Sequence, residues 1–186
     1  MPQISKLVRT QLLARLQGTD ANGQNSFNLN MTAALQAYGL SPQVIGWQNI
    51  DWTANSHNFM FGRLSPDEID SSGGAFTYPM MAIDTLTSRN TNYAKYANFA
   101  GPVQAVIDVH LSWKSSGVLQ DYSSWSDALE DALYTTLLSQ SYQRWSGGIL
   151  PEWGSAAFTK DPQIRAGGYG WRRSHTFSAV FEVVTN

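Results

Sequence analysis

The sequence predicts an α+β fold, in which a mostly antiparallel β-sheet carries an N-terminal helix and a second helix on one face, with long loop insertions. Apolar and polar side chains alternate strictly over residues 103–113, which predicts a long strand with one dry face. A second alternation over residues 169–184 predicts a closing strand. Between them, an apolar stripe at helical spacing predicts a helix over about residues 124–139 that lies across the sheet.

The N-terminal helix is expected over residues 4–16, where apolar side chains recur three and four positions apart. Gly18 is a suitable C-terminal stop for it. Residues 19–30 are polar and predict a linker, after which Asn30 is expected to cap a short helix over residues 31–38. The following stretch is weakly patterned, although Ser65-Pro66 is typical of a helix start.

The second half of the chain is more clearly patterned. Residues 76–88 predict a strand with apolar side chains on both faces, and residues 89–100 predict a polar, Asn-rich loop. Ser124 is expected to cap the second helix. Residues 141–168 contain glycine pairs and single prolines, and they predict a long loop. A loop of this length in a compact domain is usually functional or ordered by a partner.

The 186-residue composition favours one domain with a sizeable core and an assembling surface. Hydrophobic residues make up 42% of the chain, while charged residues make up 14%, against roughly 25% in average globular proteins. The chain also contains seven tryptophans, and a surface poor in charge and rich in aromatic residues is typical of interface cores. We therefore favour an obligate assembly, with a monomer that has large aromatic core residues as the alternative.

Charge and cysteine content exclude several functions. The net charge is −2 and the basic residues are scattered, so long-range attraction to nucleic acid or anionic lipid is not indicated. Cysteine is absent, which excludes disulfides and thiolate–zinc sites. Residues 1–18 lack the continuous apolar region of a signal peptide, and no stretch approaches the roughly 18 apolar residues of a spanning helix. We expect a soluble protein made in a cytoplasm, with no membrane partner.

The three histidines do not form a recognisable site. His57, His110 and His175 show no metal-ligand spacing. His110 lies two residues from Asp108 on the same strand face, and such a pair can orient a general base. A nucleophile on a sharp turn would also be needed, and the sequence has no Gly-x-Ser-x-Gly motif. A polar sheet face is the preferred interpretation.

Two clusters of carboxylates are candidates for a glycosidase-like pair, because the two carboxylates of such a pair meet only in the folded chain. A helix start and a solvated helix face explain them more simply. The glycine pairs lack the strand–loop–helix context of a phosphate cradle. We therefore expect no catalytic, cofactor-binding or metal-binding residues, no cofactor and no enzymatic activity. The clusters comprise Asp67, Glu68 and Asp70, and Asp127, Glu130 and Asp131.

Aromatic residues interleaved with polar ones are the remaining signal. Core packing, anchoring of a protein partner, and stacking on sugars or bases all remain open as interpretations. The lack of a basic groove argues against single-stranded nucleic acid. We take the following residues as candidates for a protein interface: Tyr93, Tyr96, Trp145, Trp153, Tyr169 and Trp171.

The order of elements resembles that of the tail terminator (tail-to-head joining) proteins of long-tailed phages and the related neck and tail-completion proteins. The resemblance rests on four parts of the sequence. These are the helix with Ile4, Leu7, Val8 and Leu12, the strands 76–88 and 101–114, the helix Ser-Ser-Trp-Ser-Asp-Ala-Leu-Glu-Asp-Ala-Leu at 123–133, and the final strand ending Ala-Val-Phe-Glu-Val-Val-Thr-Asn. The likeness covers roughly residues 1–18 and 76–186 and concerns element order, not a diagnostic motif. Residues 19–75 exceed what that family needs, so we interpret them as an insertion or contact arm within a single domain, 1–186.

This resemblance implies a structural protein of the virion. Members of the family form hexameric rings that cap the tail tube and join it to the head-completion or connector ring, and they are not enzymes. The expected partners are other copies of the chain, the tail tube protein and a head-completion or connector protein, and the expected location is the virion. Loops 89–102 and 141–168 would reach adjacent rings.

Three alternatives stay open. One is another neck or tail-completion protein of the same fold. A second is a β-rich module that binds carbohydrate through exposed tryptophan and tyrosine. A third is an enzyme in which two carboxylates meet only in space.

Overall fold

The computed structural model describes residues 4–18, 26–41, 50–53, 56–89, 100–114, 122–138, 144–162, 164–166 and 170–184. Its helices are α1 (Ile4–Gln17), α2 (Phe27–Ala37), α3 (Pro66–Ser71) and α4 (Tyr122–Leu138). Its strands are β1 (Phe59–Phe61), β2 (Met80–Ser88), β3 (Ala100–Lys114), β4 (Ile149–Lys160), β5 (Ile164–Ala166) and β6 (Gly170–Val184).

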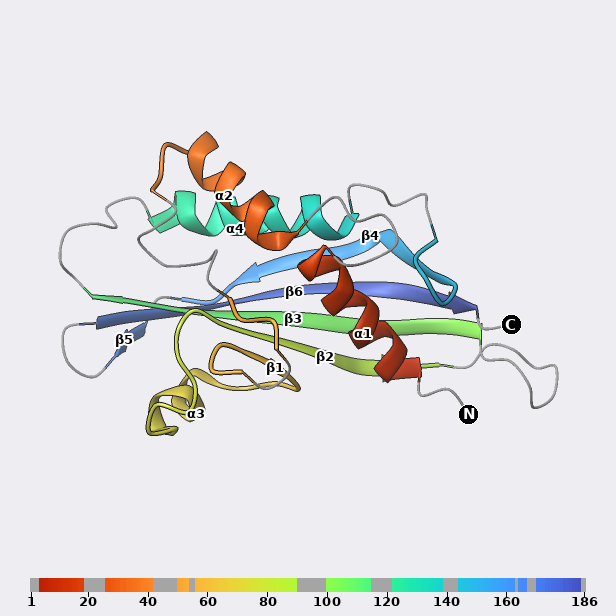
Figure 1. Cartoon of the computed structure of the whole chain (residues 1–186), viewed down its shortest axis with the longest axis horizontal. Helices are drawn as coiled ribbons and strands as arrows, with labels where there is room; N and C mark the ends of the chain where they lie inside the picture. Colours follow the sequence, from red (N-terminus) through yellow and green to blue (C-terminus); the bar gives the residue numbers. More distant parts are fainter. Residues whose placement is uncertain are drawn as a thin grey trace.

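The strands form one sheet in the order β1-β2-β3-β6-β4, and β5 pairs with β6 beyond the end of β4 (Figure 1). The short β1 runs parallel to β2, and all other pairings are antiparallel. The two longest strands, β3 and β6, pair along their whole length. The chain therefore has the α+β fold that the strand alternation predicts.

Alternate side chains of β3 and β6 build the core. Ile107 of β3 lies opposite Phe177 of β6, and Val103 lies opposite Phe181. These side chains are buried beneath α1 and α4, as the strict alternation in the sequence predicts. Each such side chain contributes roughly 1.5–3 kcal/mol through removal of apolar surface from water.

Three helices share this face of the sheet (Figure 1). Helix α1 contacts β2 and β3, whereas α4 contacts β4 and β6. Helix α2 packs against both α4 and α1. The predicted placement of the N-terminal helix and the second helix on one face is confirmed. Helix α4 begins at Tyr122, so Ser124 lies within its first turn and is not the cap that the sequence suggested.

The expected linker over residues 19–30 is partly wrong, since α2 already begins at Phe27. Its cap is Ser26, whose side chain accepts a hydrogen bond from the Leu29 N–H, and not Asn30. The apolar side chains that define the buried stripe are Phe27, Met31 and Leu35, four positions apart. Polar neighbours in the sequence make this stripe hard to recognise. The stripe belongs to the described part of residues 19–75 and lies in the core.

The expected loop over residues 141–168 is also wrong. Strands β4 and β5 lie within it, and both pair with β6. The pairing of β4 shifts register between Glu152 and Ala157, which breaks the alternation that identifies a strand in sequence. The turn before β4 needs Gly148 at φ +75°, because a side chain there would meet the Val184 carbonyl oxygen.

The start of α3 and the start of β2 lie close to where the sequence predicts them. Ser65 caps α3, Pro66 occupies the first turn, and the Glu68 side chain completes a capping box, so the predicted helix start is confirmed. The strand expected over 76–88 begins only at Met80, after Pro79, which has no N–H to donate to a neighbouring strand. The expected loop over 89–100 lies almost wholly outside the described residues, and Ala100 already belongs to β3.

Candidate functional site

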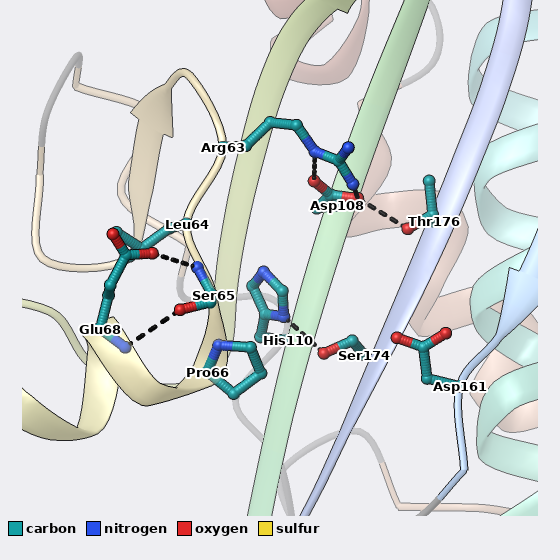
Figure 2. A pocket seen from close by; sticks show the side chains of 10 residues that line it. All are labelled: Arg63, Leu64, Ser65, Pro66, Glu68, Asp108, His110, Asp161, Ser174 and Thr176. Atoms are coloured by element: carbon teal, nitrogen blue, oxygen red, sulfur yellow. Dashed lines mark hydrogen bonds and ion pairs between the residues drawn. The ribbon is translucent and has the colours of Figure 1, made fainter.

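The face of the sheet opposite α1 and α4 carries a pocket of about 410 Å³ (Figure 2). Register places the residues of its floor side by side, with Asp108 opposite Thr176 and His110 opposite Ser174. The segment Arg63–Pro66, which leads into α3, forms one wall, and Asp161 stands on the other side. The pocket thus combines the even-numbered positions of β3 and β6 with two loop segments.

Asp108 is held by three hydrogen bonds at the top of this pocket. Its carboxylate accepts from Arg63 Nε at 2.7 Å and from Arg63 Nη2 at 3.2 Å. The Thr176 hydroxyl donates to it at 2.6 Å. The Asp108 side chain is 5% exposed, whereas that of Arg63 is 52% exposed. The charge of Asp108 is therefore neutralised in place, and the carboxylate also raises the pKa of Arg63.

His110 forms the centre of the floor. The residue is only 4% exposed, and its Nδ1 shares a hydrogen bond of 2.8 Å with the Ser174 hydroxyl. Its Nε2 is buried without a hydrogen bond of good geometry to any described residue. Burial lowers the pKa of His110, against the opposing influence of the Asp108 charge and the Leu64 backbone. The ring is therefore neutral at neutral pH.

These groups do not form a Ser–His–Asp triad. The carboxylate of Asp108 is committed to Arg63 and Thr176, so it does not hold the His110 ring in the orientation of a triad. Ser174 lies within the extended strand β6, not on a sharp turn. The arrangement can bind polar groups, but it lacks the geometry that activates a serine.

A second set of contacts fastens α3 to the sheet above this pocket. Arg172 of β6 pairs with both Asp67 and Asp70 of α3. The Tyr78 hydroxyl donates to Asp70 at 2.9 Å, and burial raises the pKa of Tyr78. Together with the Arg63–Asp108 pair, these contacts join the α3 segment to the sheet. In the Arg63–Asp108 pair the arginine belongs to the α3 segment, whereas in the other ion pairs the arginine belongs to the sheet.

The other acidic cluster also has structural partners. Lys160 of β4 pairs with Asp127 and Glu130 of α4. Asp131 accepts a hydrogen bond of 3.0 Å from the Tyr38 hydroxyl. All six carboxylates singled out in the sequence thus cap a helix or join two elements. Glu68 matches the predicted helix start, whereas the contacts of the other five with neighbouring elements were not predicted.

The helix-covered face holds a different histidine. His175 is 0% exposed, and its Nε2 shares a hydrogen bond of 2.8 Å with the Ser126 hydroxyl of α4. The Phe158 ring stacks on it, with centroids 5.6 Å apart. Burial and the Arg173 charge lower the pKa of His175 to about 3. This pair is enclosed by packing and offers no access to a ligand.

Trp145 was named as an interface candidate and is instead a core residue. It is 4% exposed, its ring lies 5.3 Å from that of Phe181, and the Arg15 guanidinium sits 4.8 Å above it. Its place in an apparently loop-like segment misled the sequence interpretation, because β4 folds that segment onto the core.

The other interface candidates are only partly described. Trp171 lies half-buried on β6. Trp153 belongs to β4, although its side chain lies outside the described part of the molecule. Tyr93, Tyr96 and Tyr169 lie outside the described residues altogether. The structure therefore brings none of these six together in one described surface.

The described tryptophans do not form the aromatic-rich surface that the composition suggests. Of the tryptophans whose side chains are described, Trp125 and Trp145 are buried and Trp52 and Trp171 are half-buried. Among the side chains that the structure describes, the exposed large apolar ones are instead scattered: Leu29, Tyr38, Leu86, Ile164 and Val184. Such singles are ordinary on a protein surface.

Sequence reasoning found only half of the pocket. The alternation in β3 singled out Asp108 and His110, but Ser174 and Thr176 become their neighbours only through strand pairing. Arg63 lies in the weakly patterned region, where no signal marks it. Among the described residues, no cluster of three or more His, Asp or Glu side chains could hold a metal ion. The described helices include none with the length and apolar character needed to cross a bilayer.

Comparison with known proteins gives no assignment. No protein-family model matches this chain. No curated protein matches it either.

Proposed function

We propose that this chain is a structural subunit of a phage head–tail junction, a tail terminator. Its copies would form a ring, expected to be hexameric, that caps the tail tube and joins it to a head-completion or connector ring. The supporting observation is the order α1, β2, β3, α4, β4, β6, with α1 and α4 on one face of an antiparallel sheet. The elements α1, β2, β3, α4 and β6 follow the order on which the resemblance to tail terminators rests, while α2 and β4 are additional to it.

The strand edges also favour association between copies. Strand β4 ends the sheet on one side, and β6 is its strand partner among the described residues. On the other side, β1 covers only residues 81–83 of β2, so that among the described strands residues 84–88 of β2 lie at an edge. Unpaired strand edges are templates for pairing with another chain. Leu86, 45% exposed, lies on this edge.

The two other classes of function gain less support. A carbohydrate-binding platform needs several exposed aromatic rings. Among the described residues no tryptophan is exposed, and Tyr38 is a single exposed tyrosine whose hydroxyl donates to Asp131. An enzyme with two catalytic carboxylates needs carboxylates that are not already committed, and the six weighed in the sequence have structural partners. A structural subunit needs neither feature.

Light scattering coupled to size exclusion, followed by electron microscopy, tests the ring. We expect particles of about six times the 20.6 kDa chain mass, with a central hole. Leu86→Lys should reduce the assembled fraction, because it places a charge on the β2 edge. Leu29→Lys is the matched control, since Leu29 is 68% exposed on α2, away from the edge. A strict monomer at every concentration contradicts the proposal.

A further inference from the structure

Helices α2 and α4 pack side by side, and a groove of about 420 Å³ lies between them at the surface (Figure 1). Its α2 wall is lined by Ala33, Ala34 and Ala37, and its α4 wall includes Tyr134. Ala33 and Ala37 are exposed, while Ala34 and Tyr134 are half-buried. Small side chains allow another helix to come close, since the distance between two helix axes depends on the side chains at their contact. The groove therefore offers space and apolar lining for one further element.

Helix α2 presents an uncharged face to solvent. None of its 11 residues is charged. Leu29 is 68% exposed, and the exposed Ala33 and Ala37 follow it on the same side at intervals of four residues. A solvated helix face normally carries charged or polar side chains. This side of α2 therefore has the character of a helix face that packs against another element.

The α4 wall of the groove is acidic. Glu130 and Asp131 line it, and Asp127 lies one turn before Asp131. Lys160 pairs with Asp127 and Glu130, so the described ion pairs balance only part of the negative charge of this row. The last residue of α2, Ala37, also lines the groove, and a helix C-terminus carries partial negative charge. The groove therefore favours a partner with positive charge.

We infer that this groove docks a helix of a partner protein, one that carries alanine or leucine on its contacting face and lysine or arginine at its flank. The alanines of α2 and the Tyr134 ring receive the apolar side chains. Asp131 receives the basic side chain, because its carboxylate keeps acceptor sites beside the hydrogen bond from the Tyr38 hydroxyl. Docking of an amphipathic helix in an apolar groove is a common mode of recognition, and charge at the rim selects the partner.

The described part of a second copy does not supply such a helix. Helices α2, α3 and α4 contain no lysine or arginine. In α1, Arg9 pairs with Asp84, and Arg15 is buried with its guanidinium over the Trp145 ring, which leaves Lys6 as the exposed cation of that helix. The partner is therefore a different protein, and the inference does not depend on the proposed ring of identical copies.

Docking can be followed by NMR on the isotope-labelled full chain at neutral pH. The probe is a helical peptide of about 18 residues, or five turns, built from alanine, leucine and lysine with the lysines beside the apolar face. The control peptide has glutamate in place of every lysine. We expect the basic peptide to shift the amide signals of α2 and α4 along the groove, with weaker binding at higher salt, and the acidic peptide to leave them unchanged.

The unlabelled chain is a further probe, because it tests a second copy as the occupant. We expect it to leave the amide signals of α2 and α4 unchanged. The same shifts at rising chain concentration would overturn the assignment to a different protein.

Ala33→Lys is the decisive variant, because it places a positive charge and a long side chain in the groove at an exposed helix position where lysine is a good helix former. We expect it to weaken binding of the basic peptide about tenfold or more. Gln36→Lys adds the same charge at an exposed position of α2 outside the groove lining and should bind normally. Leu86→Lys, which tests the ring, should also bind normally, so the two proposals can fail separately. Equal binding of both peptides, no shift in α2 or α4, or full affinity in Ala33→Lys would each overturn the inference.

Discussion

The two faces of the sheet each carry a buried histidine bonded to a serine, yet they differ in what lies beyond the ring. His175 is covered by α4 and by Phe158, and its environment is closed. His110, on the paired strand and the opposite face, lines a pocket that opens beside α3. Burial of the two residues is nearly the same, at 0% and 4% exposed. Covering by a packed helix, and not burial alone, therefore separates a structural pair from a candidate binding site.

The largest expected difference between the faces concerns packing. Phe177→Ala should lower the free energy of unfolding by about 3–5 kcal/mol, because it opens a cavity under α4. The next residue, Ser178, points to the opposite face, and Ser178→Ala should change stability by less than about 0.5 kcal/mol. Urea unfolding at pH 7 measures both. Equal losses would mean that the two faces are packed alike.

Acid should weaken the helix-covered face next most strongly. The pKa of His175 is about 3 when folded, against 6.5 for the ordinary side chain, so the unfolded chain binds a proton first as pH falls. This contribution to stability is complete above pH 6.5 and declines by about 1.4 kcal/mol per pH unit down to pH 3. Urea unfolding between pH 7 and 4 measures this slope.

Two variants sharpen the interpretation of that slope. His175→Gln should make it shallower, since glutamine does not titrate, and the rest of the slope then includes His110, whose pKa is also lowered by burial. Replacing the exposed His57 by Gln should leave the slope unchanged. If His175→Gln keeps the wild-type slope, other groups govern the acid response.

The pocket face should depend instead on its buried carboxylate. Arg63→Ala leaves Asp108 buried with only Thr176 as its described partner and should lower the free energy of unfolding by about 2 kcal/mol. Adding Asp108→Asn should restore part of this loss, because the uncompensated charge is removed. A double-mutant cycle from urea unfolding gives the coupling. If the losses in the two single variants add up to the loss in the double variant, the pair contributes no interaction energy.

The smallest effect is expected for the exposed ion pairs that join α3 to β6. Arg172→Gln removes the ion pairs to Asp67 and Asp70, which are 84% and 41% exposed at their side chains. Salt-screened pairs of this kind contribute up to about 1 kcal/mol. Hydrogen exchange should become faster in α3 but not in α4. Unchanged protection of α3 would show that the other contacts suffice to hold it.

Local periodicity predicted the elements that carry their own signal. The alternation in β3 and β6 and the apolar stripe of α4 identified those elements within a few residues. Strand β4 was missed, because Pro151, Gly154 and a register shift interrupt its alternation. Helix α2 was placed too late, because its stripe begins among the polar residues around Phe27. In both cases the missing information is the neighbouring element that supplies the packing.

The sequence by itself determined the fold class, the dry face of β3 and the absence of cysteine chemistry, since these follow from composition and from side-chain period. Tertiary structure alone decided that Trp145 is buried, that the acidic clusters bind Arg172 and Lys160, and that Ser174 joins His110. The physical reason is the separation along the chain over which each effect acts. Period and capping act over a few residues, whereas strand register and burial depend on partners tens of residues away.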